Sequence, residues 1–248
     1  MAQGFDTSGS AHHGDRVREP GGNLIPNSRL GARLRELERG VIRWLGGRSE
    51  RDVEHDFIRR QVGSRSLRIL EIGGVGSMLS LDLARAGHAV TTCDIYPYPA
   101  RHPNLQSIQG DFLKWQFGSA AFDAVILLST LEHIGFGYYH DSVLGDGDRA
   151  AVRKVRELLR ESGRLVLTTP FSGRGRIVDG FERWYDMARL TDLLAGFKLV
   201  ACEFWVPKVW LFGRCLKWVY AAADEAAQSE ALYHYHAIVC LVAEKTGA

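Results

Sequence analysis

The chain has 248 residues and a formal net charge of +2, and 46% of its residues are hydrophobic. This length fits one large domain, or one domain with a small cap, and the apolar content supports a substantial core. The near-neutral charge excludes a general attraction of the whole chain to nucleic acid or to a membrane surface. No apolar run is long enough for a membrane span, and the first residues lack a signal-peptide pattern. We therefore expect a cytoplasmic protein.

The cysteines are widely spaced, with no CxxC pair, and most of them sit in apolar runs. This spacing predicts buried thiols in a reducing compartment rather than disulfides or a metal centre. No cluster of His, Cys, Asp and Glu has ligand spacing either, so we expect a metal-independent protein.

Residues 1–27 are rich in glycine, proline and polar residues without apolar periodicity, which predicts a flexible N-terminal arm. Residues 28–65 are predicted to form a helical cap. An apolar stripe from Leu30 to Leu45 indicates one helix, and a second is expected over Glu50 to Val62. Arginine is dense in this region, which raises the possibility of an RNA-binding face. Interleaved acidic residues favour a solvated helix face with ion pairs.

The stretch from Leu67 to Asp94 reads as strand, glycine turn, helix, strand and acid. A buried strand over Leu67–Ile72 runs into glycines that permit a sharp turn and close approach of a ligand to the backbone. The acid follows about 20 residues beyond the turn, which is typical of nucleotide-binding units, where it holds a ribose diol.

Further along, alternating patterns predict more strands and helices, and Asp148 is expected to cap one of the helices. The expected strands cover Leu105–Ile108, Phe122–Leu128, Arg164–Thr169, Phe197–Phe204 and His236–Ala243. The expected helices cover Asp148–Glu161 and Asp186–Ala195. The aromatic stretch within Pro207–Glu230 fits core packing, a lid or a dimer face. This order predicts an α/β fold with a doubly wound, mostly parallel sheet and an antiparallel pair near the end.

Four ordered signals make the chain resemble class I S-adenosylmethionine-dependent methyltransferases: ILEIGGVG, the strand-end Asp94, QGDF at Gln109–Phe112, and FDAVILLSTLEH at Phe122–His133. The resemblance runs from about Leu67 to the C-terminus. It implies a Rossmann-like domain over residues 66–248 with seven strands, the last antiparallel. It also implies S-adenosylmethionine as cofactor and S-adenosylhomocysteine as product. A dehydrogenase is the weaker alternative, because a dinucleotide needs helix-terminus amides aimed at its pyrophosphate.

The resemblance also assigns roles to residues. It implies that the glycine turn lies beneath the methionine part of the cofactor, that Asp94 takes the ribose hydroxyls, and that Asp111 accepts from the adenine amino group. The complete implied cofactor set is Glu71, Gly73, Gly74, Gly76, Asp94, Ile95, Asp111, Phe112, Ser129, Thr130 and Leu131. The turn departs from the family pattern, which has glycine at the first, third and fifth places after the acid and one spacer. Counted from Gly73 as the first place, the third is Val75 and the fifth is Ser77.

His133 follows the fourth expected strand and is the candidate general base, since its ordinary pKa lies near neutrality. A structural histidine at a strand–loop junction is the alternative. The loop after it supplies candidate acceptor contacts at Tyr138, Tyr139 and His140, and His140 and Asp141 are further candidates for the base. The loop after Pro170 supplies Arg174, Arg176 and Arg183 for an anionic or polyhydroxylated acceptor, and Trp184 for a sugar face or the core.

The favoured hypothesis is a methyltransferase that acts on an oxygen or nitrogen of a small molecule. A sugar-containing natural product of secondary metabolism, such as antibiotic biosynthesis, would fit. An RNA or protein methyltransferase is an alternative, but STLE stands where base amino-group methyltransferases often carry Asn/Asp-Pro-Pro-aromatic. A non-catalytic cofactor-binding module is a third hypothesis. We expect a small-molecule acceptor rather than nucleic acid or a membrane, and we consider a homodimer as a further hypothesis.

Overall fold

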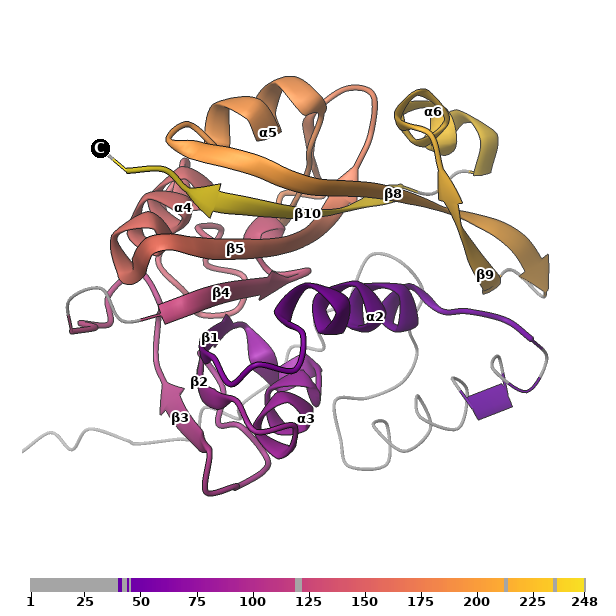
Figure 1. Cartoon of the computed structure of the whole chain (residues 1–248). Coiled ribbons are helices and arrows are strands. Elements are labelled where there is room, and N and C mark those ends of the chain that lie inside the picture. Colours follow the sequence, from indigo (N-terminus) through magenta and orange to yellow (C-terminus); the bar gives the residue numbers. More distant parts are fainter. Residues whose placement is uncertain are drawn as a thin grey trace, which may run out of the picture. The chain divides into compact units, whose positions relative to one another are not determined.

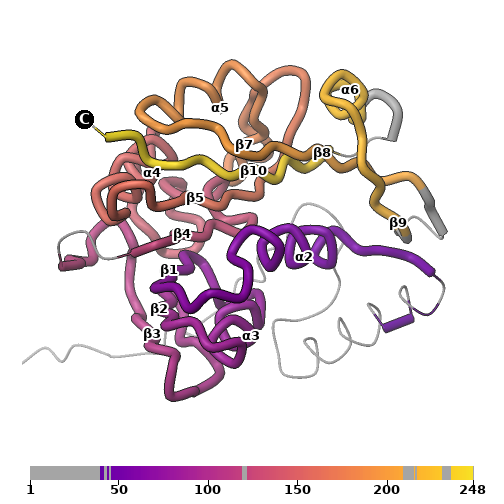
Figure 2. The backbone as a smooth tube through the Cα atoms, viewed as in Figure 1, coloured from indigo at the N-terminus to yellow at the C-terminus, as the bar shows by residue number. Residues whose placement is uncertain are grey.

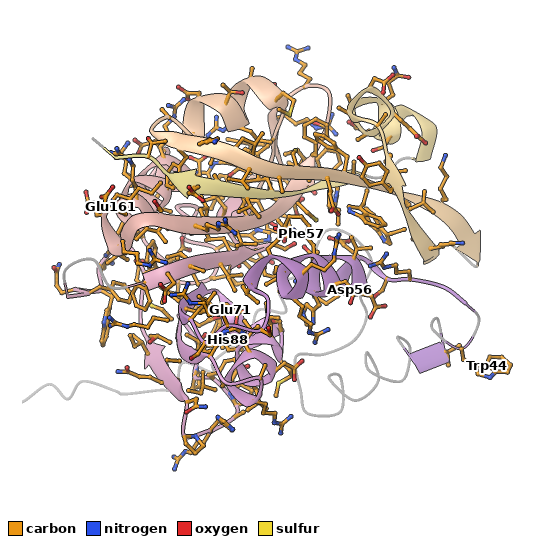
Figure 3. The ribbon with its side chains drawn as sticks, viewed as in Figure 1. Trp44, Asp56, Phe57, Glu71, His88 and Glu161 are labelled. Carbon is orange, nitrogen blue, oxygen red and sulfur yellow. The ribbon has the colours of Figure 1, made fainter. Side chains whose placement is uncertain are left out.

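The structure is a computed structural model that describes residues 40, 41, 44, 46–118, 122–211, 214–233 and 236–247. Residues 38–248 form one compact unit. The expected arm over residues 1–27 lies outside the described residues, as does most of the first expected cap helix. Trp44, one of its described residues, is 83% exposed and points away from the sheet (Figure 3).

An eight-stranded sheet forms the centre of the fold, in the order β3-β2-β1-β4-β5-β10-β8-β9 (Figure 1). The first five strands pair in parallel, whereas β10 is antiparallel to both β5 and β8. The strands are β1 Arg68–Ile72, β2 Ala89–Asp94, β3 Leu105–Gln109, β4 Phe122–Leu128, β5 Leu159–Phe171, β8 Phe197–Leu211, β9 Arg214–Ala221 and β10 Ala237–Lys245. The predicted doubly wound α/β fold with a late antiparallel strand is confirmed.

The expected strand number of seven is one too low. The aromatic stretch whose pattern was ambiguous continues β8 and then returns as β9, which pairs antiparallel with it. The helix α6, Ala223–Tyr233, follows this hairpin. Figure 2 traces the hairpin as it extends beyond the neighbouring strands.

Helices cover both faces of the sheet (Figure 1). The helices α4, Gly147–Leu158, and α5, Met187–Leu193, cover one face, and α2, Glu50–Val62, and α3, Leu79–Arg85, cover the other. Along β4, Val125 and Leu127 face the first layer, while Ala124, Ile126 and Leu128 face the second. This alternation explains why β4 reads as a continuous apolar run: a strand covered on both faces buries every side chain.

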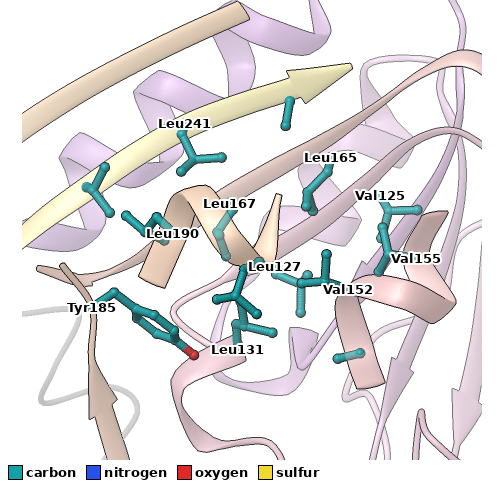
Figure 4. Packing of buried hydrophobic residues seen from close by; sticks show 14 of the residues in the cluster. Val125, Leu127, Leu131, Val152, Val155, Leu165, Leu167, Tyr185, Leu190 and Leu241 are labelled. Carbon is teal, nitrogen blue, oxygen red and sulfur yellow. The ribbon is translucent and has the colours of Figure 1, made fainter. Parts of the chain in front are cut away.

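The larger core lies between the sheet and α4 and α5. Leu127, Leu167 and Leu241 come from three neighbouring strands, and Val152 and Val155 of α4 pack on them (Figure 4). Burying side chains of this kind contributes about 1.5–3 kcal/mol each relative to exposure. The core thus fixes the carboxyl ends of β1, β4 and β5, where the candidate site lies.

The second expected cap helix is α2, with the predicted bounds. Its N-terminal Ser49 and Asp52 form a reciprocal capping box, and Val53, Phe57 and Ile58 are buried against the sheet. Ahead of it, the Arg48 carbonyl accepts from the Trp218 amide of β9 at 2.9 Å. This segment is therefore joined to the sheet rather than separate from it.

The described cysteines are free thiols, with Cys93 and Cys240 buried. None of the described helices combines the length and apolarity that a membrane span requires.

Candidate functional site

The candidate site lies at the carboxyl ends of the parallel strands. The turn after β1, Asp94 at the end of β2, and Ser129–Thr130 after β4 meet there, because neighbouring parallel strands end at the same edge. Two 3₁₀ turns mark this edge, η1 over Gly74–Gly76 and η2 over Leu131–His133.

The backbone of Gly73 lies close to the Thr130 side chain at this edge of the sheet. Its φ of +77° lies in the left-handed region, and a Cβ added there would stand 2.4 Å from Thr130 Oγ1. Its amide donates to the Cys93 carbonyl of β2 at 2.9 Å. A side chain at Gly74 would meet Thr92 and Glu71, whereas one at Gly76 would meet nothing within 4 Å.

The family's other turn glycines are not needed by this backbone. Among the described residues of the turn, only Gly73 has a positive φ. Ser77 is extended, with φ −128° and ψ 155°, and Val75 donates its amide to Asp94 Oδ2 at 2.9 Å. The departure at Val75 and Ser77 is therefore compatible with the strand–turn–helix geometry.

Glu71 is buried inside the fold (Figure 3). Its carboxylate accepts from the Ser77 hydroxyl at 3.0 Å and also from the Ser80 hydroxyl. Burial raises the pKa of Glu71, and these serine hydrogen bonds oppose that shift. Glu71 thus stabilises the end of the turn and the start of α3 through its hydrogen bonds with Ser77 and Ser80.

Asp94 and Ile95 lie at the end of β2, and both are partly buried. The Asp94 carboxylate accepts from the amides of Val75 and Tyr96, each at 2.9 Å. Burial raises its pKa, and the two amides act in the opposite direction. A carboxylate has about four acceptor positions, so these contacts leave Asp94 capacity for a pair of hydroxyl donors.

Asp111 and Phe112 follow β3. Asp111 Oδ1 accepts from the Leu113 amide at 2.8 Å, and Oδ2 accepts from both the amide and the hydroxyl of Ser142. The Phe112 ring is buried in the larger core, where it packs on Phe117 with ring centroids 5.8 Å apart. Asp111 therefore connects the turn after β3 with the loop after η2.

Ser129, Thr130 and Leu131 continue from β4. Ser129 has a φ of +43°, its amide donates to Thr168 and its hydroxyl to Glu54. The Thr130 hydroxyl donates to the Leu128 carbonyl at 2.9 Å, and Leu131 is fully buried.

The residues that the sequence interpretation missed are on α2. Glu54 is fully buried and accepts from the Thr168 hydroxyl at 2.7 Å as well as from Ser129. The Arg51 guanidinium lies 3.1 Å from the other Glu54 oxygen. A glutamate among the apolar residues of α2 was the available signal, because an unpaired carboxylate is rarely buried.

Other acidic groups surround Arg51. Burial raises the pKa of Glu50 to about 7, although nearby His236 opposes the shift. Burial also raises the pKa of Glu132 well above its ordinary value. The carboxylates of Glu54, Glu50, Glu132 and Glu71 all hold the pKa of Arg51 up. Arg51 is therefore a cation among four acidic side chains.

His133 has a defined orientation. Its Nδ1 lies 3.0 Å from the Phe181 carbonyl oxygen, and because a carbonyl can only accept, Nδ1 carries the hydrogen. The ring stacks on Phe181 with centroids 5.4 Å apart and meets Tyr139 edge-on at the same separation. Burial lowers the pKa of His133, so the neutral ring keeps an acceptor lone pair on Nε2 at neutral pH.

The expected acceptor contacts are only partly brought together. Tyr138 and Tyr139 pack against each other, and Tyr138 also lies 5.0 Å from the Phe181 ring. His140 is exposed, with a φ of +67°. Tyr138 and Tyr139 thus form one aromatic group with His133 and Phe181, and His140 is not part of it.

The loop after Pro170, which was also expected to contact the acceptor, contains the hairpin of β6, Arg176–Val178, and β7, Glu182–Trp184. Arg174 is exposed, and Arg176 pairs with Glu230 of α6 while it covers the Trp184 ring at 4.4 Å. Arg183 is not available to an acceptor, because it is 2% exposed and donates to the carbonyls of Ile134 and Gly145.

Asp148 does not cap α4 as expected. Its buried carboxylate accepts from the Tyr185 hydroxyl at 3.3 Å and from Arg189 Nη2 at 2.6 Å. Among the described residues, no group of three or more His, Cys, Asp and Glu side chains is arranged to hold a metal ion. Metal independence remains a prediction.

Comparison with known proteins bears on the fold. Residues 102–204, less than half of the chain, match a family described as "Caenorhabditis protein of unknown function, DUF268". A ubiquinone biosynthesis O-methyltransferase of Xanthomonas oryzae pv. oryzae is 27% identical over 129 residues, which are 47% of this chain and 48% of that protein. Its counterpart from Xanthomonas campestris pv. campestris is 29% identical over the same shares. The chain thus spans about half the length of these relatives.

Solved structures match over more of the chain. A 1,6-didemethyltoxoflavin N1-methyltransferase from Burkholderia thailandensis, with S-adenosylhomocysteine bound, covers 87% of this chain and 86% of its own with a TM-score of 0.58 and 17% identity. The N-methyltransferase NodS of Bradyrhizobium japonicum covers 80% and 88%, with a TM-score of 0.51 and 17% identity. The [4+2]-cyclase SpnF covers 82% and 84%, with a TM-score of 0.54 and 18% identity. The chain therefore has the fold of class I S-adenosylmethionine-dependent methyltransferases, as the sequence predicted.

Substitution of Gly73 tests the geometry of the turn. Gly73→Ala forces a side chain into the left-handed region, at about 1–2 kcal/mol, and against Thr130. We expect the free energy of unfolding in urea to fall by about 2–4 kcal/mol, since overpacking adds to the backbone strain. Gly76→Ala is the matched control, because its Cβ meets nothing within 4 Å, and it should change stability by less than about 0.5 kcal/mol. Equal losses in the two variants would contradict this assignment.

Glu50 gives a pH-dependent prediction. Its pKa is raised from 4.5 to about 7, so between these values the folded chain binds more protons than the unfolded chain, and stability falls as the pH rises. We expect Glu50→Gln to stabilise the protein at pH 8 by on the order of 1 kcal/mol. The gain should vanish near pH 4.5.

Thermal unfolding at both pH values measures this difference. Glu157→Gln, which removes an exposed carboxyl from α4, is the control and should show no such pH dependence. A gain for Glu50→Gln that is the same at both pH values would rule out burial of its charge as the cause.

Proposed function

We propose that this protein is a methyltransferase that uses S-adenosylmethionine to methylate an oxygen or nitrogen of a small molecule. The observation that carries the proposal is the position of Asp94. Its carboxylate is fixed by the amides of Val75 and Tyr96, beside the turn that Gly73 makes possible, and it keeps acceptor capacity for two hydroxyls.

The neighbouring residues fit the rest of such a cofactor. Asp111 has one further acceptor position for the adenine amino group, with Ile95 near the end of the adjacent strand. Gly73, Gly74 and Gly76 and the Ser129–Leu131 segment would surround the methionine part. The Arg51 side chain, which is 32% exposed, would meet the carboxylate of the methionine part. The surrounding glutamates would favour the ammonium group of the methionine part.

The cofactor, when bound, supplies a methyl group already activated by its positive sulfonium. The protein's own task is to hold the acceptor in line, and such positioning contributes up to roughly 7–11 kcal/mol. His133 takes the acceptor's proton on Nε2, because the Phe181 carbonyl holds Nδ1 as the donor. Burial lowers the pKa of His133 and the Glu182 charge partly opposes that shift, so Glu182 stabilises the imidazolium that results.

Aromatic side chains beside His133 suit a small acceptor. Tyr138, Tyr139 and Phe181 offer flat apolar surfaces beside His133, where a ring or sugar face can pack. The similar proteins named as a 1,6-didemethyltoxoflavin N1-methyltransferase and a ubiquinone biosynthesis O-methyltransferase support a small-molecule acceptor. A sugar-containing natural product of secondary metabolism is the narrower form of the proposal.

The second candidate is a protein that binds the cofactor without transferring its methyl group. The similarity to the [4+2]-cyclase SpnF favours keeping it, because that structure is named for a different reaction on this fold. RNA or protein methylation has no comparable support, since the arginines along α2 pair with acids such as Asp82 and Glu203.

Asp94→Ala tests cofactor binding by isothermal titration calorimetry. We expect wild type to bind S-adenosylmethionine and the variant to bind on the order of 100-fold more weakly, because hydrogen bonds to a charged group contribute about 1.5–3 kcal/mol each. Asp82→Asn is the control, since that carboxylate pairs with Arg59 on the surface, and it should bind as wild type does. Absence of binding heat for wild type at high micromolar cofactor would defeat the proposal.

His133→Ala tests the proton acceptor. A methyl-transfer screen over aminosugars, glycosides and phenols comes first, with S-adenosylhomocysteine as the measured product. For any acceptor found, we expect kcat to fall about 10²–10⁴-fold, as for loss of a general base, while cofactor affinity is kept. Wild-type kcat should decline below a pH that lies under the ordinary histidine pKa of 6.5, because burial lowers the pKa of His133. Unchanged turnover in His133→Ala would make His133 structural.

A further inference from the structure

The loop between η2 and α4, residues 134–146, is termed the acceptor loop here. It is built from its own contacts: the Gly135 amide donates to Asp141 at 2.8 Å, and the Leu144 amide donates to the Gly135 carbonyl at 2.8 Å. Phe136 and Val143 pair across it. The loop therefore has a defined shape with Tyr138, Tyr139 and His140 near its tip.

Arg183 fixes the base of the acceptor loop. Its guanidinium donates to the Ile134 carbonyl at 2.7 Å and the Gly145 carbonyl at 3.2 Å, and it stacks over the Phe136 ring at 4.1 Å. Gly135 and Gly147 cross so closely that a Cβ on Gly147 would stand 2.6 Å from the Gly135 Cα. The two ends of the loop are thus held together inside the protein.

Ser142 joins the other side of the loop to the turn after β3. Its amide donates to Asp111 Oδ2 at 2.9 Å, and its hydroxyl donates to the same oxygen. The Asp111 side chain is 12% exposed, so water competes weakly for these bonds. A hydrogen bond to an ionised partner is stronger than one between neutral groups.

The bonding capacity of Asp111 decides what this link does. A carboxylate has about four acceptor positions. Ser142 takes two on Oδ2, and the Leu113 amide takes one on Oδ1. The remaining position is on Oδ1, so a donor on the ligand side can bind without displacing Ser142.

We propose that Ser142 is a positioning residue that couples occupancy of the adenine end of the cofactor site to the acceptor loop. The inference rests on the proposed function. A ligand amino group on Asp111 holds the carboxylate in the orientation that Ser142 also requires. Through Tyr139, which meets the His133 ring edge-on, the ordered loop then supports the proton acceptor. Cofactor binding thereby prepares the acceptor side.

Hydrogen–deuterium exchange of the full chain, with and without saturating S-adenosylhomocysteine, tests this coupling without a known acceptor. In wild type we expect the ligand to slow exchange in the acceptor loop about tenfold, as expected for one charge-assisted hydrogen bond. In Ser142→Ala the slowing of the loop should fall to about twofold or less, while the peptide containing the turn at residues 73–78 stays protected. Ser142→Thr keeps the hydroxyl and should restore the loop's protection.

Val143→Ala is the matched control. Val143 follows Ser142 in the loop and its side chain is 83% exposed, so this variant should behave as wild type. A loop in Ser142→Ala that the ligand protects as fully as in wild type overturns the inference. So does a wild-type protein in which the ligand protects the turn but not the loop, and in that case the proposed function stands. Lack of protection at both the turn and the loop of wild type overturns the proposed function and this inference together.

Discussion

The buried Glu54 carboxylate is the interaction on which the candidate site depends. Removing an ionised carboxylate from water costs several kcal/mol unless partners replace the lost hydration. Here the partners come from three elements: Arg51 on its own helix, the Ser129 hydroxyl after β4 and the Thr168 hydroxyl on β5. Loss of any of them leaves a buried charge underbonded. The Glu54 carboxylate therefore fixes α2 against the ends of β4 and β5. The second helix of the expected cap thus lies beside the candidate site.

The sheet could be predicted because its signals are local. Each parallel strand is a short apolar run, and the glycine turn and strand-end acid mark where the chain reverses. The turn also shows which glycine the geometry needs. Within the turn over residues 73–77, only Gly73 combines a left-handed backbone with a contact that no side chain would permit, so Val75 and Ser77 are tolerated at places where the family pattern has glycine. A motif records common residues, whereas the backbone selects on φ and on free space.

The errors arose where a side chain's partner is distant in the sequence. Asp148 has the residue type and position of a helix cap, but it bonds to Tyr185 and Arg189. Arg183 stands in a polar, glycine-rich stretch that resembles a surface loop, yet it binds carbonyls of another loop from inside the protein. The aromatic segment after Pro207 has the composition of a core or a lid, and pairing with β8 makes it the strand β9. Pairing of this kind is set by the fold, which local patterns do not encode.

The donors of the buried acids give the site its electrostatic character. Glu71 is bonded by the hydroxyls of Ser77 and Ser80, and Glu132 by that of Thr169. Hydroxyl donors satisfy the hydrogen-bonding capacity of a carboxylate but leave its negative charge in place. A paired cation would cancel that charge. Burial raises the pKa of both groups, although Arg51 opposes this shift for Glu71, so a further positive charge makes their ionisation less costly. A site of this kind is stabilised by a cationic ligand more than by a neutral or phosphorylated one. This preference is a physical reason, separate from the glycine motif, for a sulfonium cofactor over a dinucleotide.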